Sequence, residues 1–160
     1  MHKATRTHSQ AADQIEKSIE LKASVSRVWR ALTDHHEFGA WFRVDLSGVR
    51  FEPGKLAQGK MTYPGHEGAP FEMIIDRMEA PRLFAFRWHP YGIDQDYDYS
   101  SEPMTLIEFR LDEVEGGTRL TVTESGFDAI PLSRRAEAFR MNSEGWSEQI
   151  RNIEAYVTRG

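Results

Sequence analysis

The alternation of apolar and polar residues predicts that the ordered part of the chain begins with a strand and two short helices. Between Ile15 and Leu21 the apolar residues fall mainly on alternate positions, which is the period of a half-buried β-strand. Ser24 and Asp34 each precede apolar residues at helical spacing, and both residue types cap helices. We therefore expect a strand followed by two helices, and a disordered polar tail at residues 1–13 before them.

The middle of the chain is rich in short segments of β character, several of them separated by Gly- and Pro-containing turns. The predicted strands cover residues 44–51, 56–63, 71–78, 83–88, 105–111 and 118–124. A long acidic loop, residues 89–104, separates the last two from the others, and loops of this length are usually functional or mobile.

Apolar residues at three- and four-residue spacing from Phe139 to Val157 predict a long C-terminal helix, with Ser133 as its N-cap. Only this helix is long enough to cover the apolar face of about seven strands. We predict an α+β fold, in which a curved antiparallel sheet of about seven strands surrounds the C-terminal helix and the two short helices close one end. Residues 14–160 form a single domain in this prediction, and a cavity lies between sheet and helix.

Composition narrows the functional classes. The 160-residue chain contains no Cys, which excludes disulfides, thiolate metal sites and a cysteine nucleophile. Its net charge of −5 argues against nucleic acid as a partner. No apolar run approaches the roughly 20 residues of a membrane span, and no secretory signal begins the chain, so we expect no membrane partner and a cytoplasmic location.

The motifs of nucleotide, metal and nucleophile chemistry are incomplete. The stretch from Gly54 to Lys60 has phosphate-loop spacing, but Met61 stands where a Ser or Thr hydroxyl would hold magnesium. We expect Gly54 and Gly59 to serve a turn and a tight bend of the sheet instead. The histidines do not cluster, and Ser125 lacks the glycine pattern of a hydrolase nucleophile. We therefore expect no metal, no cofactor and no catalytic residue.

Glu124 is the most informative single residue, because it shares the parity of Leu120 and Val122 on the apolar face of its strand. Three interpretations stay open at this point. The strand could end at Thr123 and leave Glu124 in solvent, Glu124 could be a polar contact in a ligand cavity, or it could form a structural ion pair, for which Lys17 has the right parity.

Several aromatic residues also occupy the apolar faces of their elements, where each belongs either to the core or to the wall of a cavity. The candidate ligand-binding residues are Trp41, Tyr63, Phe86, Trp88, His89, Glu124, Phe139 and Trp146.

Four motifs in a fixed order carry a family resemblance. They are VWRALT at residues 28–33 with Trp41-Phe42 after it, PRLFAFRW at 81–88, GGTRLTVTESGF at 116–127, and EGW at 144–146. With them the chain resembles the START-like helix-grip superfamily, also called SRPBCC, over about residues 14–158. Within that superfamily it is similar to homologues of the activator of the heat-shock-protein-90 ATPase.

The resemblance implies a protein that binds a small apolar or aromatic ligand between the sheet and the C-terminal helix. One alternative is a cyclase- or hydrolase-like enzyme acting on an aromatic or polyketide-like substrate, as in some relatives. Another is a regulator of a chaperone ATPase that acts through its outer surface. The leading interpretation is ligand binding without catalysis, and the sequence leaves the oligomeric state open.

Overall fold

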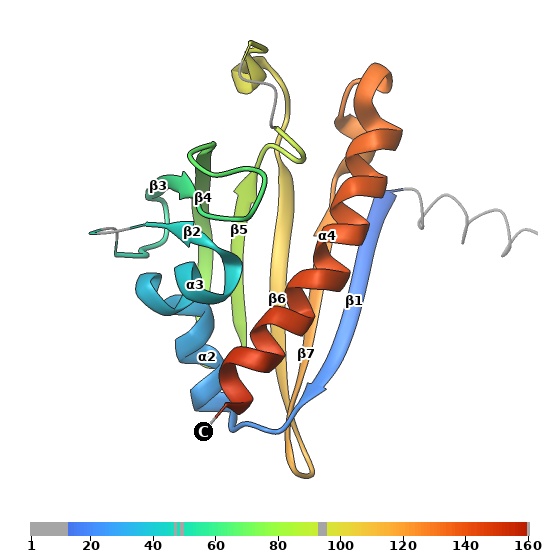
Figure 1. Ribbon diagram of the computed structural model, residues 1–160. Coiled ribbons are helices and arrows are strands. Elements are labelled where there is room, and N and C mark those ends of the chain that lie inside the picture. The colour runs from blue at the N-terminus through green and yellow to red at the C-terminus, as the bar shows by residue number, and fades with distance from the viewer. Residues whose placement is uncertain (1–12, 47, 49, 93–95, 160) are drawn as a thin grey trace, which may run out of the picture.

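A computed structural model describes residues 13–46, 48, 50–92 and 96–159, in which one antiparallel sheet curves around a long helix (Figure 1). The predicted α+β fold is confirmed, including the two short helices after the first strand. In chain order the elements are β1 (Gln14–Leu21), α2 (Val25–Thr33), α3 (His35–Phe42), β2 (Val44–Asp45), β3 (Leu56–Met61), β4 (Pro70–Glu79), β5 (Leu83–Trp88), η1 (Tyr99–Ser101), β6 (Thr105–Val114), β7 (Gly117–Ser125), η2 (Phe127–Ala129) and α4 (Leu132–Thr158).

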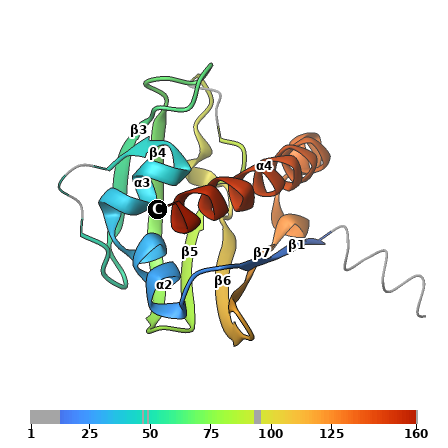
Figure 2. The same cartoon turned by 60° about the horizontal axis from the view of Figure 1, so that its bottom comes forward.

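The seven strands follow the order β1-β7-β6-β5-β4-β3-β2, and every neighbouring pair is antiparallel. From β2 to β7 each strand pairs with the next one along the chain, whereas β1 pairs with β7. Helix α4 crosses the concave face of the sheet, and α2 and α3 close one end (Figures 1 and 2). The first strand and the last helix are thereby brought together, and α4 contacts β1.

Side-chain caps fix the two short helices where the sequence predicts them. The Ser24 hydroxyl accepts a hydrogen bond from the Arg27 amide at 3.2 Å. The Asp34 carboxylate accepts two, from the amides of His36 at 2.9 Å and Glu37 at 3.0 Å. These bonds satisfy amides that lack partners inside the first helical turn.

The start of α4 differs from the prediction. The N-cap is Pro131 rather than Ser133, and its carbonyl accepts hydrogen bonds from the amides of Arg134 and Arg135, both at 3.0 Å. Proline fixes its own φ near the helical value and needs no amide partner, so the helix begins directly after it. Ser133 lies in the first turn.

The strand predicted over residues 44–51 is also shorter than expected, because only Val44 and Asp45 pair with β3. A Cβ at Gly59 would lie 2.1 Å from the carbonyl oxygen of Asp45, so only glycine allows β2 to approach β3 this closely. Gly54 has a φ of +86° in the turn before β3. The expected turn at Gly54 is therefore confirmed, whereas Gly59 serves a close approach of β2 to β3 instead of the expected sheet bend.

The core between the sheet and the helices is built largely of aromatic rings. Phe38, Phe84, Phe86 and Phe109 are all at most 1% exposed. The indole N–H of Trp41 donates to the Ala31 carbonyl at 2.8 Å, which fastens α3 to the end of α2. The polar atom of this buried indole thus finds its partner in the backbone.

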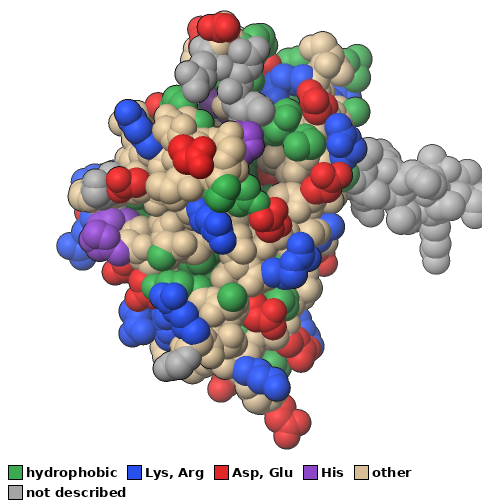
Figure 3. Space-filling view, viewed as in Figure 1, with side chains coloured by type: hydrophobic (Ala, Val, Ile, Leu, Met, Phe, Trp, Pro, Cys, Tyr) green, Lys and Arg blue, Asp and Glu red, His purple; other side chains and the backbone are tan. Residues whose placement is uncertain are grey.

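On the face drawn in Figure 3, basic and acidic side chains are interspersed over α4 and the loops beside it. None of the helices in the described ranges combines the length and hydropathy that crossing a bilayer requires. The predicted tail lies outside the described residues except for Asp13, whose carboxylate accepts a hydrogen bond from the Asp128 amide at 3.0 Å. Residues 93–95 of the predicted acidic loop also lie outside them.

Candidate functional site

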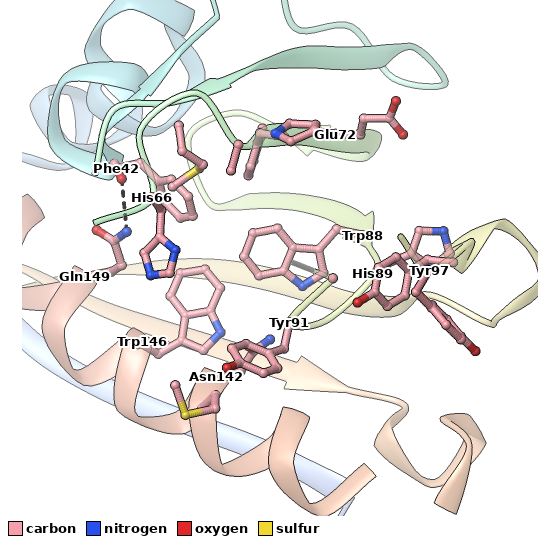
Figure 4. A pocket seen from close by; sticks show the side chains of 18 of the residues that line it. Phe42, His66, Glu72, Trp88, His89, Tyr91, Tyr97, Asn142, Trp146 and Gln149 are labelled. Atoms are coloured by element: carbon pink, nitrogen blue, oxygen red, sulfur yellow. Dashed lines mark hydrogen bonds between the residues drawn. The ribbon is translucent and has the colours of Figure 1, made fainter. Parts of the chain in front are cut away.

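A pocket of about 690 Å³ lies between one end of the sheet and α4 (Figure 4). Its wall combines the end of β5, the start of β4, the loops that follow β3 and β5, and one face of α4. His66 and Gln149 lie toward one end of it, and His89 and Tyr97 toward the other. The aromatic residues of the wall, apart from the histidines, are Phe42, Phe71, Trp88, Tyr91, Tyr97, Tyr99 and Trp146.

Two indoles form the centre of this wall. Trp88 ends β5, Trp146 lies on α4, and their rings stack with centroids 5.6 Å apart and an interplanar angle of 24°. Phe42 and Phe71 each pack 6.0 Å from the ring of Trp88. The sheet and the helix therefore meet through a continuous aromatic surface at the pocket.

Glu124 lies behind the two indoles and is fully buried. Trp88 Nε1 donates to its Oε2 at 2.8 Å, and Trp146 Nε1 donates to its Oε1 at 2.8 Å. Thr105 Oγ1 donates to Oε2 at 2.5 Å, and Asn142 Nδ2 reaches both oxygens at 3.0 and 3.1 Å. One carboxylate thus connects β5, β6, β7 and α4.

The donors around Glu124 match an ionised carboxylate. An indole N–H and an amide NH₂ can only donate, so the three residues that present them need an acceptor at the carboxylate oxygens. Within the described part of the chain, no Lys or Arg forms a salt bridge with Glu124. The negative charge is therefore stabilised by neutral hydrogen-bond donors.

This arrangement decides between the interpretations left open by the sequence. Strand β7 continues to Ser125, so the interpretation with Glu124 in solvent is wrong. Register places Ile15 opposite Glu124 and Lys17 opposite Val122. Glu124 does not line the pocket itself. It holds in place three residues that do line it: Trp88, Asn142 and Trp146.

Helix α4 presents one polar and aromatic stripe to the pocket. Asn142, Trp146 and Gln149 are spaced four and three residues apart, so they share a helix face. The buried amide of Gln149 donates to the Phe42 carbonyl at 3.1 Å, which ties the end of α3 to α4. Gly145 also lines the pocket, and a Cβ placed there would meet no atom within 4 Å. The pocket therefore has free space directly over this glycine.

An ion pair fastens the loop after β5 to the first turns of α4. Arg134 Nε donates to Glu102 Oε1 at 2.9 Å, and Arg134 Nη1 donates to the Pro90 carbonyl at 2.8 Å. The Tyr97 hydroxyl donates to Glu102 Oε2 at 2.6 Å. Burial alone would raise the pKa of Glu102, but the bonds from Arg134 and Tyr97 outweigh it and lower that pKa. The pocket wall at Tyr97 and Tyr99 is anchored by this pair.

His89 lines the pocket from the loop after β5. Burial lowers the pKa of its imidazole below the ordinary value, against the raising effect of nearby Glu102. Its Nδ1 atom is buried and has no hydrogen-bond partner among the described residues. His89 thus lines the pocket with a neutral imidazole whose buried Nδ1 is unused.

The structure brings only three of the sequence-predicted candidates into the pocket wall: Trp88, His89 and Trp146. Trp41 and Phe86 lie in the core, and Glu124 lies one layer behind the wall. Phe139 packs on Phe127 instead, with ring centroids 5.1 Å apart. Tyr63 lies outside the wall on the loop after β3, where its hydroxyl bonds to Glu148 of α4.

Part of the wall was missed because it comes from loops. Tyr91, Tyr97, Tyr99 and His66 lie on segments without a periodic pattern, which gives no indication of where a side chain points. Asn142 carried a usable signal, since it precedes Trp146 by four residues on a face already identified as inward. In the ranges that the structure describes, no three His, Asp or Glu side chains gather closely enough to hold a metal ion.

Solved structures of similar fold come from several bacteria. Protein Ms6760 from Mycobacterium smegmatis has a TM-score of 0.73 at 21% identity, over 94% of each chain. Protein MLL2253 from Mesorhizobium loti has a TM-score of 0.70 at 17% identity, over 90% of this chain and 96% of the other. DynU16, described as a putative protein in the dynemicin biosynthetic locus, has a TM-score of 0.65 at 23% identity, over 91% of this chain and 47% of its own.

These likenesses confirm the fold, and the START-like resemblance inferred from the four sequence motifs agrees with them. The curated proteins contain no match to the sequence. The model of one protein family does match, over residues 22–158, which span everything from the end of β1 to the end of α4. The chain therefore belongs to the family of Activator of Hsp90 ATPase homolog 1-like proteins.

Proposed function

We propose that the protein binds a small aromatic molecule in the pocket between the sheet and α4. A volume of about 690 Å³ lies within the range of about 300–1,000 Å³ that is usual for small-molecule sites. The wall is mostly aromatic, with a few polar groups that can orient a ligand. Both properties are typical of ligand sites rather than of packing defects in a core.

One observation carries this proposal: the stacked pair of Trp88 and Trp146 is held by the buried Glu124 at the edge of open space. A buried carboxylate is costly, and here all its hydrogen bonds go to residues of the pocket wall or to the neighbouring strand. The rigid indole surface that results is suited to a planar ring, because offset stacking favours aromatic partners.

Gly145 offers a direct test with a matched control. Gly145→Phe projects a ring into the free space of the pocket, whereas Gly145→Ala adds only a methyl group to the same helix position. The probe is naphthylmethanol, a neutral bicyclic aromatic, and its affinity is measured by titration calorimetry. We expect the alanine variant to bind like the unmodified protein and the phenylalanine variant to bind at least about tenfold more weakly, a difference of about 1.4 kcal/mol.

Equal binding by both variants would contradict the proposed location of the ligand. Failure of the unmodified protein to bind the probe at any accessible concentration would contradict the proposed function. Thermal unfolding of all three proteins verifies that they are folded, and alanine is expected to stabilise the helix by up to about 1 kcal/mol relative to glycine.

A second candidate function is catalysis on an aromatic or polyketide-like compound. The observation that favours it is His89, whose unpartnered Nδ1 and lowered pKa are the properties of a general base. DynU16, which has a similar fold, is described as a putative protein in the dynemicin biosynthetic locus. The test is hydrolysis of naphthyl acetate, followed by the fluorescence of released naphthol. Turnover that is lost in His89→Gln supports catalysis, and no turnover above the buffer rate rejects this hydrolytic activity.

Binding of a chaperone by the outer surface stays a prediction, for which the family name is the reason. Co-purification of a chaperone with the protein, unaffected by Gly145→Phe, would support it.

A further inference from the structure

The charges around the pocket indicate which charge a bound ligand would carry. This inference rests on the proposed function, the binding of a small aromatic molecule. The described lining residues include neither Lys nor Arg, and the carboxylate that they present is that of Asp98. Glu72 also borders the pocket, but it alternates with the buried Phe71 on β4, and its carboxylate accepts a hydrogen bond from Gln58 Nε2 at 2.9 Å on the exposed face of the sheet. The lowered pKa of His89 removes one potential positive charge near neutral pH. The described pocket wall therefore presents a carboxylate and no Lys or Arg to a ligand.

Glu124 adds a second carboxylate directly behind the aromatic wall. It is fully buried, and both indole N–H groups at the centre of the wall point to it, at 2.8 Å each. A hydrogen bond from an indole N–H to a carboxylate leaves the ring more electron-rich, and the face of an indole is already the most attractive aromatic surface for a cation. The low dielectric around Glu124 also lets its charge act across the rings.

Two arginines lie close to tyrosines in this region. Arg134 lies with its guanidinium 4.8 Å from the centre of the Tyr99 ring, but it is paired with the buried Glu102. Arg43 lies 5.7 Å from the centre of the Tyr63 ring, and the Tyr63 hydroxyl contacts the carboxylate of Glu148. Neither arginine lines the pocket. An anionic ligand would thus meet a carboxylate without a compensating cation in the wall.

We propose that the pocket selects aromatic ligands that carry a positive charge, such as an aryl-alkyl ammonium ion, and rejects carboxylates of the same shape. The planar part stacks on Trp88 or Trp146, and the ammonium group lies toward the carboxylate of Asp98. Recognition of organic cations by aromatic faces gains further from such a nearby anion.

Three probes of one skeleton test this inference: naphthylmethylammonium, naphthylmethanol and naphthoate, all substituted at the same ring carbon. Their affinities are measured by titration calorimetry at low ionic strength. We expect the ammonium probe to bind about tenfold more tightly than the alcohol, and naphthoate to bind more weakly than both. Added salt should reduce the preference for the ammonium probe.

Asp98→Asn is the variant of choice, because Asp98 is exposed and lies outside the buried network around Glu124. We expect it to reduce the ammonium-to-alcohol affinity ratio by severalfold. Glu115→Gln, in the exposed turn between β6 and β7 at the opposite end of the molecule, makes the same change of net charge and should leave the ratio unaltered (Figure 1).

The outcomes separate this inference from the proposed function. Naphthoate binding as tightly as the ammonium probe, or equal affinity for the ammonium probe and the alcohol, would overturn the charge selectivity and leave aromatic binding standing. Absence of binding by all three probes would overturn both.

Discussion

At the scale of single residues, Glu124 determines how the pocket wall is built. Its inward direction could be predicted from the alternation in β7, because Leu120 and Val122 have the same parity. Its partners could not, since Trp88, Thr105, Asn142 and Trp146 come from four other places in the sequence. Hydrogen-bond partners between distant segments depend on register and helix tilt, which no local pattern encodes.

Glu124→Gln should therefore destabilise the protein strongly despite its similar shape. The new amide NH₂ would face donors, and at least one indole N–H would lose its acceptor in a buried site. We expect a loss of at least about 2 kcal/mol in the free energy of unfolding, measured by denaturant titration. Glu16→Gln, on the exposed face of β1, removes the same charge and should change stability by less than about 0.5 kcal/mol. An equal effect of the two substitutions would contradict the network.

His89 gives a prediction about pH. Because burial lowers its pKa in the folded protein, the unfolded chain binds a proton first as the pH falls below the ordinary value of 6.5. His89 should then reduce stability progressively below that pH, until the folded form is protonated as well. The measurement is the unfolding free energy of the protein minus that of His89→Gln at several pH values. This difference should fall between neutral pH and the folded pKa, and a rise over that window would contradict the sign of the shift.

At the scale of elements, boundaries set by local chemistry were predictable and those set by packing were not. Ser24 and Asp34 cap α2 and α3 as the sequence indicates, through bonds within three residues. Strand β2 ends early because the chain leaves the sheet after Asp45, and its close approach to Gly59 involves a residue fourteen positions away. The position of the loop after β5 likewise depends on Arg134, a residue of α4 remote in sequence.

Arg134→Met should loosen that loop and destabilise the fold. The side chains of Arg134 and Glu102 are only 16% and 3% exposed, so removal of the guanidinium leaves a buried carboxylate without its cation. We expect a loss of about 3 kcal/mol and faster amide exchange at residues 96–102. Arg140→Met removes an exposed pair with Glu144 on the same helix and should cost less than about 0.5 kcal/mol. Unchanged exchange in Arg134→Met would show that the pair does not anchor the loop.

At the scale of the whole molecule, the element order was sufficient to predict a curved sheet around one long helix. The pairing of β1 with β7 and the crossing of α4 over the concave face place residues from both ends of the chain beside each other (Figure 2). The pocket lies between the sheet and α4, at one end of the sheet. Its exact wall could not be predicted, because loops after β3 and β5 supply much of it.

The central claim is that an aromatic ligand binds against Trp88 and Trp146, and the four tryptophans of the chain allow one direct measurement. An NMR titration of the isotope-labelled protein with naphthylmethylammonium reports each indole N–H separately. We predict that the signals of Trp88 and Trp146 shift together and saturate, while those of Trp29 and Trp41, outside the pocket wall, stay in place. Saturable shifts confined to Trp29 or Trp41, or no saturable shift at any indole, would contradict the account.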